Sequence, residues 1–166
     1  RRDDGNEFFP TRARDAITAV AYGVLGPGGA AAEDALYFAD AGGYGRIYLR
    51  EPGQSDVQLV FQDLSTRVQQ LLVDPRDWQH VFAVTPLGDV LESVDAGATW
   101  GTTALLPEEF GELMFLPGPF SDELVVWSDA QGLLAMLHAP LQDTRTSRWL
   151  HIEGNLPVAV GSNRVV

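Results

Sequence analysis

One stretch decides the fold: residues 90–100 read Val90-Leu91-Glu92-Ser93-Val94-Asp95-Ala96-Gly97-Ala98-Thr99-Trp100. Residues 90–94 alternate in the manner of a half-buried strand. The following residues predict a turn bonded to itself, because the Asp95 carboxylate can accept backbone N–H groups and Gly97 can adopt a positive φ. Ser93 and Thr99 offer hydroxyls to the same network. Trp100 begins the returning strand and brings a large apolar body with one N–H to satisfy. We therefore predict a β-hairpin with a specifically bonded turn.

The hairpin belongs to a pattern that recurs along the chain. Units starting near residues 17, 68 and 111 each hold four short apolar or alternating runs separated by Gly- or Pro-containing turns. The predicted strands are 17–22, 35–39, 46–50 and 57–61 in the first unit, 68–73, 80–84, 90–94 and 100–105 in the second, and 112–116, 123–127, 133–137 and 149–152 in the third. Four short strands in a repeat of about 40–50 residues are typical of a β-propeller blade.

The pattern predicts an all-β fold, a β-propeller segment of about three four-stranded antiparallel blades plus a partial fourth. Blades are expected at about 17–64, 68–107 and 111–157, after a linker or leader strand over 1–16, with 158–160 and 164–166 starting a further blade. Propellers usually close with four to eight blades, so three blades leave sheet faces open. We expect other protein chains, or the rest of a longer chain, to complete the propeller.

Both ends of the sequence favour this interpretation. The chain begins with Arg1-Arg2-Asp3-Asp4 and without an initiator methionine or signal-peptide pattern, and 163–166 resemble the beginning of a strand. We interpret the chain as a processed or partial piece of a longer protein.

Composition narrows the class of protein. The 166 residues are 45% hydrophobic and 20% charged, as in a soluble globular domain with a core. The net charge of −12 argues against a nucleic-acid partner, and all 11 basic residues are arginine. No apolar run reaches the ~20 residues of a membrane span. Without cysteine, disulfides and thiolate metal sites are excluded.

The S-x-D-x-G-x-T-W pattern, with the preceding Leu72-Val73-Asp74-Pro75 and the strand 80–84, resembles the Asp-box (BNR) repeat. This repeat occurs in sialidase-like, sortilin-like and xyloglucanase-like propellers and in photosystem II assembly factors of the same fold. The resemblance covers residues 68–107; the first unit has 51–56 in place of the box, and the third has a longer turn over 139–147. The resemblance implies a structural, fold-stabilising role for Ser93, Asp95, Gly97, Thr99 and Trp100. The catalytic residues of sialidases and xyloglucanases cannot be placed on this sequence.

The acidic residues and histidines form no clear catalytic or metal-binding pattern in the sequence. Glycoside hydrolysis needs two carboxylates beside one bond, and the adjacent pairs are Glu33-Asp34, Glu108-Glu109 and Asp122-Glu123. All three pairs lie next to turns, so we interpret them as solvated. His80, His138 and His151 follow no metal-ligand spacing and are interpreted as surface or half-buried structural residues.

Calcium is the one cofactor considered. Asp74, Asp77, Asp89 and Asp95 could supply oxygen ligands, but they fall in different loops and follow no EF-hand spacing. We interpret them as turn caps, and we predict no catalytic or cofactor-binding residue.

Most aromatic residues occupy strand positions and are expected to pack between blades. Trp78, between Asp77 and Gln79, is predicted to lie in an exposed loop and to form part of a contact surface for a protein or a glycan.

These observations favour a non-catalytic, extracytoplasmic β-propeller module, secreted or at the cell surface, that acts as an interaction scaffold. One alternative is a fragment of a sialidase- or xyloglucanase-like glycoside hydrolase. Another is a propeller of the photosystem II assembly-factor type, for which no basic cofactor-binding patch is visible in the sequence.

Overall fold

The computed structural model describes residues 16–27, 30–41, 45–63, 67–106, 110–116, 123–128, 132–136 and 149–151. These residues contain twelve β-strands. The strands are β1 (Ile17–Leu25), β2 (Ala31–Asp40), β3 (Gly45–Arg50), β4 (Gln58–Asp63), β5 (Gln70–Asp74), β6 (Asp77–Val84), β7 (Asp89–Ser93), β8 (Gly101–Leu105), β9 (Phe110–Leu116), β10 (Glu123–Ser128), β11 (Gly132–Met136) and β12 (Trp149–His151). Each predicted strand is present, and β2 and β6 begin earlier than predicted.

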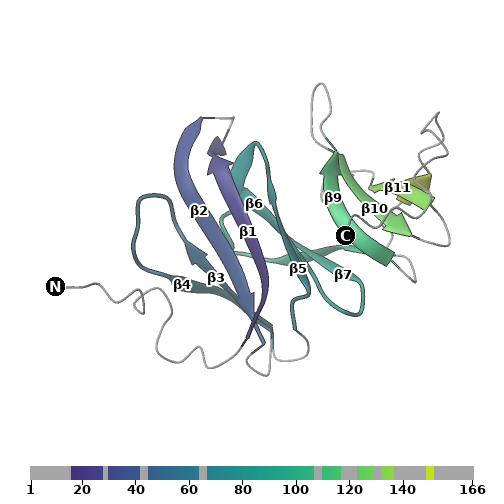
Figure 1. Cartoon of the computed structure of the whole chain (residues 1–166), viewed down its shortest axis with the longest axis horizontal. Coiled ribbons are helices and arrows are strands. Elements are labelled where there is room, and N and C mark those ends of the chain that lie inside the picture. The colour runs from purple at the N-terminus through teal and green to yellow at the C-terminus, as the bar shows by residue number, and fades with distance from the viewer. Residues whose placement is uncertain are drawn as a thin grey trace, which may run out of the picture.

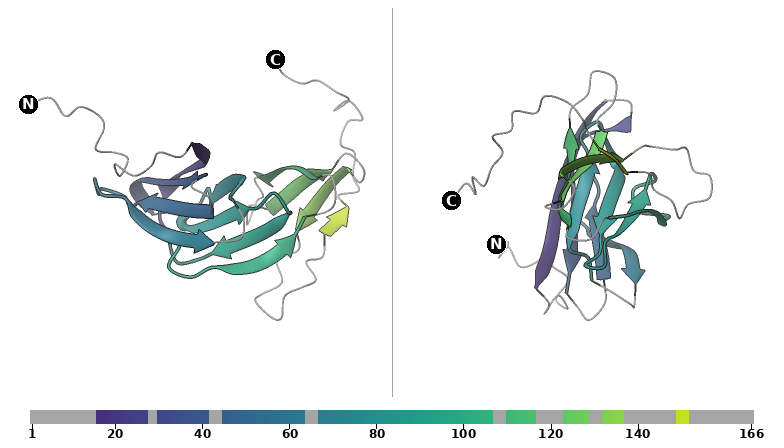
Figure 2. Two further views of the ribbon diagram at one scale, coloured as in Figure 1. Left: turned by 90° about the horizontal axis from the view of Figure 1, so that it is seen from below. Right: turned by 90° about the vertical axis from the view of Figure 1, so that its right-hand side faces the viewer.

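The strands form three four-stranded antiparallel sheets, ordered β1-β2-β3-β4, β5-β6-β7-β8 and β9-β10-β11-β12. In Figure 1 the sheets follow one another across the molecule in chain order, and the left view of Figure 2 shows the same succession from below. β1 contacts β5 and β6, and β5 contacts β9, so the first strands of the sheets are neighbours. The all-β prediction of repeated four-stranded units is confirmed.

Strand alternation places two apolar layers between the three sheets. In β6, Val81 and Ala83 belong to the layer shared with the first sheet, whereas Phe82 and Val84 belong to the layer shared with the third. Successive side chains of a strand point to opposite faces, so one strand supplies both layers. The middle sheet is therefore buried on both faces.

The predicted linker 1–16, except its last residue, lies outside the described residues, as do the long turn 139–147 and the predicted beginning of a fourth blade, 158–160 and 164–166. Within the described residues, no helix has the length and apolar character needed to cross a membrane.

Gly23 of β1 allows the first and second sheets to approach each other closely. A Cβ atom built on Gly23 would lie 2.6 Å from the Cβ of Trp78 and 2.8 Å from the Cγ1 of Val73. Both contacts are shorter than van der Waals packing allows, and the backbone Cα of Trp78 lies only 3.1 Å away. Any larger residue would push the two sheets apart.

We expect Gly23→Ala to lower the free energy of unfolding by about 1–3 kcal/mol, the usual cost of overpacking a core. Gly101→Ala is the matched control, because a Cβ atom there meets nothing within 4 Å. It should change stability by less than about 0.5 kcal/mol. Chemical denaturation of both variants measures the difference, and equal stabilities would contradict the close approach.

Gln70 connects the second sheet to the third. Its side-chain Nε2 donates to the carbonyl oxygen of Leu113 at 2.6 Å, and the Leu113 N–H donates to Gln70 Oε1 at 3.2 Å. One amide side chain thus bonds both backbone groups of a residue in β9. This pairing fixes the position of β9 beside β5.

Gln70→Ala should lower stability by about 1–2 kcal/mol, because it leaves two partly buried backbone groups of Leu113 without this partner. The neighbouring Gln69 is exposed, and its backbone N–H, which bonds the Val84 carbonyl, is retained in Gln69→Ala. Denaturant unfolding of both variants tests this, and an equal loss in the two would rule out a specific role for Gln70.

Candidate functional site

The turn after β7 is organised around the carboxylate of Asp95. Asp95 Oδ1 accepts hydrogen bonds from the Thr99 N–H and from Ser93 Oγ, each at 2.8 Å, and Asp95 Oδ2 accepts one from Thr99 Oγ1 at 2.6 Å. Ser93 Oγ in turn accepts the Gly97 N–H at 2.8 Å. The self-bonded turn expected from these residues is therefore present.

These hydrogen bonds act on the charge of Asp95. The Thr99 hydroxyl, then the Thr99 backbone N–H and the Ser93 hydroxyl, hold the pKa of Asp95 below its ordinary value of 3.8. Hydrogen bonds donated to a carboxylate favour its ionised form. The donors of the turn thus favour an ionised Asp95.

Two consecutive residues with positive φ close the turn. Gly97 has a φ of 86° and Ala96 a φ of 59°. The Ala96 N–H donates to the Gln79 carbonyl at 2.9 Å, which joins the turn to the start of β6. A Cβ atom at Gly97 would lie 2.8 Å from the Cβ of Val60 in β4. The hairpin therefore presses directly against the first sheet.

Trp100 connects the hairpin to the outer strand of that sheet. Its Nε1–H donates to the carbonyl oxygens of Gly97 at 3.0 Å and of Val60 at 3.3 Å, and its ring lies 5.3 Å from that of Phe61. Val60 is the extra residue at the register shift between β3 and β4. A bulged residue lacks a regular ladder partner, and Trp100 bonds its carbonyl from the neighbouring sheet.

Asp95→Asn should lower Tm by about 2–4 °C at neutral pH, because a neutral amide accepts hydrogen bonds less strongly than a carboxylate. Since the folded pKa of Asp95 is lowered, its contribution is complete above the ordinary pKa and is lost as pH falls through the folded pKa. Asp95→Asn should therefore flatten the acid side of a Tm–pH curve. Asp56→Asn, at an exposed loop residue, should not. Parallel curves for the wild type and Asp95→Asn would contradict this role.

Trp78 lies in the core, and the prediction that it is exposed is wrong. Only 9% of the residue is accessible, and it packs in the layer between the first and second sheets. β6 begins at Asp77, and the register shifts between Val73 and Asp74, so Trp78 is a strand residue turned toward the first sheet. Its carbonyl accepts the buried Tyr37 hydroxyl at 3.1 Å.

Tyr37 is correspondingly fixed in its neutral form. Burial raises the pKa of Tyr37, and the negative charges of Glu51, Asp77 and Asp95 raise it further. A neutral phenol keeps the O–H that the Trp78 carbonyl needs.

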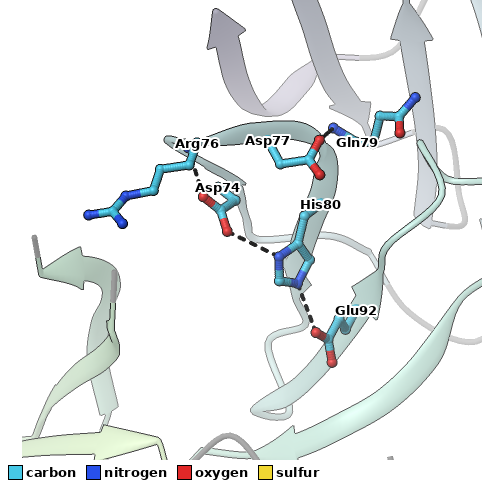
Figure 3. Close-up of polar contacts among 6 residues, drawn as sticks. All are labelled: Asp74, Arg76, Asp77, Gln79, His80 and Glu92. Atoms are coloured by element: carbon cyan, nitrogen blue, oxygen red, sulfur yellow. Dashed lines mark hydrogen bonds and ion pairs between the residues drawn. The ribbon is translucent and has the colours of Figure 1, made fainter. Parts of the chain in front are cut away.

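A cluster of three titratable side chains lies at the other face of the second sheet; we call it the His80 cluster (His80, Asp74 and Glu92; Figure 3). His80 Nδ1 lies 3.2 Å from Asp74 Oδ2, and His80 Nε2 lies 2.8 Å from Glu92 Oε1. All three side chains are largely buried, with 18%, 21% and 10% of their surfaces accessible. Burial lowers the pKa of His80, but the hydrogen bonds and charges of Glu92 and Asp74 outweigh it and raise the pKa above 6.5.

The geometry of the His80 cluster suits ion pairing. The two carboxylates bond opposite nitrogens of one ring, so they do not converge on a common point (Figure 3). Across the described ranges, no three His, Asp or Glu side chains are grouped so that they could hold a metal ion. Calcium binding stays an untested alternative to the predicted turn caps.

The four aspartates considered for calcium all bond groups in or beside turns. Asp74 and Asp77 accept the backbone N–H groups of Arg76 and Gln79, Asp89 accepts the Thr85 hydroxyl, and Asp95 has the partners given above. Each bond is of the kind that side chains make when they cap a turn.

Of the predicted carboxylate pairs, the structure describes only one side chain, the exposed Asp34. For Glu33 and Glu123 it describes the backbone alone, and Glu108, Glu109 and Asp122 lie outside the described residues. His138 lies outside them too, and of His151 only the backbone is described.

The sequence contains one signal for the His80 cluster. Asp74 and His80 flank the Pro75 turn, so a tight β5–β6 hairpin brings them together. Glu92 could not be assigned to them, because its place depends on the β6–β7 register, which pairs it with Phe82.

Comparison of the fold with solved protein structures finds similar chains. The chain is similar to the crystal structure of a GH74 enzyme from Niastella koreensis, with a TM-score of 0.50 and 16% sequence identity over 72% of this chain and 21% of that chain. At this identity the likeness shows the fold alone, and it supports the β-propeller assignment. The chain spans about a fifth of that enzyme's length. No family model matches the sequence, and no curated protein matches it.

Proposed function

We propose that this chain is a non-catalytic, extracytoplasmic β-propeller segment that serves as an interaction scaffold, with the hairpin 93–100 as an Asp box that joins adjacent blades. The observation that carries this proposal is the apolar outer face of the first sheet. The occupants that we propose for such faces are further four-stranded sheets, from other protein chains or from the rest of a longer chain.

The first outer face (Val20, Tyr22, Val24 and Leu59) points away from the second sheet. The β1 members alternate with Ala19 and Ala21, which pack in the buried layer. Val20, Tyr22 and Val24 are 58%, 53% and 51% accessible. The register continues the face across the sheet, from Val20 through Phe38 and Tyr48 to Leu59. Phe38 within this row is only 3% accessible, so the accessible apolar surface consists of the three β1 side chains and Leu59. Exposed apolar side chains grouped in this way favour an interaction site.

The third sheet presents a similar surface at the other end of the stack. Met114 and Leu116 alternate with the inward-facing Leu113 and Phe115, and Trp127 follows the inward-facing Val126. These three outward side chains are 36–38% accessible. The alternation that buries the inner faces of the sheets therefore continues on both outer faces, which favours further sheets as their occupants.

A double variant, Val20→Thr with Val24→Thr, tests the scaffold proposal, because threonine keeps the strand preference and reduces the apolar surface. We expect the wild-type chain to self-associate in a concentration-dependent manner by light scattering, and the double variant to have a lower average mass at an unchanged Tm. Leu87→Thr is the control, because Leu87 is an isolated exposed residue in a turn. The proposal would be contradicted if the wild-type chain were a monomer at all concentrations and the variants had the same average mass.

The second candidate is a fragment of a glycoside hydrolase, and the fold likeness to the GH74 enzyme favours it. The two functions differ in turnover: a scaffold binds other sheets or a glycan and releases no sugar. Incubation of the purified chain with xyloglucan and with a sialoside, followed by reducing-sugar and sialic-acid assays, separates them. Sustained release of sugar by the chain would favour the hydrolase function over the scaffold function.

A further inference from the structure

The His80 cluster joins three strands of the second sheet through one side chain. The imidazole extends from β6 and bonds Asp74 at the end of β5 and Glu92 in β7. Only a protonated imidazole carries an N–H on both nitrogens. A neutral ring donates from one nitrogen, so one carboxylate would face a lone pair instead of a donor. Loss of the proton must therefore break one of the two bonds.

In the described part of the chain, two acidic side chains and an aromatic ring lie against His80. Asp74 and Glu92 supply the charges, and Asp77, the other acid of the turn, bonds the Gln79 N–H. Arg76 donates its backbone N–H to Asp74, and its guanidinium extends away from the imidazole (Figure 3). The Phe82 ring packs against the imidazole, and the Phe115 ring of β9 packs against Phe82. When the ring is protonated, its charge lies between two anions.

An aromatic row connects the cluster to the third sheet. The His80 ring lies 4.6 Å from that of Phe82, and the Phe82 ring meets Phe115 of β9 edge-on at 5.8 Å. Gln70 bonds Leu113 of the same strand. The side chain that changes charge is therefore in contact with the layer that holds β9 in place.

We propose that His80 acts as a pH-sensitive device at the junction of the second and third sheets: the protonated ring holds the β5–β6 turn and β7 together and supports Phe82 against β9, and deprotonation loosens the junction. This inference stands on the described residues and does not depend on the scaffold or hydrolase function.

The sign of the pH dependence follows from the direction of the shift. Because the folded pKa of His80 is raised above 6.5, its stabilising contribution is complete below the unfolded value and is lost as pH rises through the folded value. The junction should loosen as pH rises through the folded pKa of His80.

The experiment uses the full chain with His138→Gln and His151→Gln, which leaves His80 as the single histidine. NMR reports the imidazole titration, and amide exchange at Leu113, corrected for the intrinsic pH effect, reports the junction between about pH 6 and pH 9. We expect a titration midpoint above that of free histidine and faster corrected exchange above it. Glu92→Gln should lower the midpoint, and His80→Gln should abolish the pH dependence of exchange. The Gln69→Ala control should behave as the parent.

Two results would overturn the proposal. One is a midpoint at or below that of free histidine, and the other is the same pH-dependent Leu113 exchange in His80→Gln as in the parent chain. If His80→Gln does not fold, the titration of the parent chain and the midpoint in Glu92→Gln still test the proposal. A raised midpoint with exchange at Leu113 that does not follow it would also refute the coupling to the third sheet.

Discussion

Apolar contact between successive sheets is the constraint on which this structure depends. A four-stranded meander alone exposes both faces, and the middle sheet here is stable only because each face is covered. β6 shows the arrangement most clearly, with Val81 and Ala83 on one side and Phe82 and Val84 on the other. The same requirement applies to the outer face of the first sheet. There Val20, Tyr22 and Val24 have the alternation of a buried face and remain accessible.

Apolar burial does not by itself fix how one sheet is positioned against the next, and hydrogen bonds between sheets do. Trp100 bonds the carbonyl of Val60, Tyr37 bonds that of Trp78, and Gln70 bonds both backbone groups of Leu113. In each case a polar tip on a largely buried side chain reaches a backbone group of the neighbouring sheet. Apolar layers alone would tolerate sliding of one sheet over another, and these bonds fix the register between sheets.

The charges of the second sheet serve structure in the same way. The donors of its own turn favour the ionised form of Asp95, and two acids favour the protonated form of His80. Both groups cap or connect elements of one blade; the contribution of Asp95 is lost as pH falls, and that of His80 is lost as pH rises. These two charged groups thus act on the packing of the second sheet.

The local elements of this protein follow from its sequence alone. Alternation and turn residues are short-range properties, so all twelve strands and the bonded turn around Asp95 could be predicted from neighbouring residues. Tertiary structure decided what depends on register and on the approach of sheets. The local pattern misplaces Trp78, because a register shift turns it inward. The same pattern does not predict the Gly23 contact, the Gln70–Leu113 pair or the bond from Glu92 to His80. Residues 41 and 43 positions apart meet across these junctions, and no local pattern encodes which atoms face each other there.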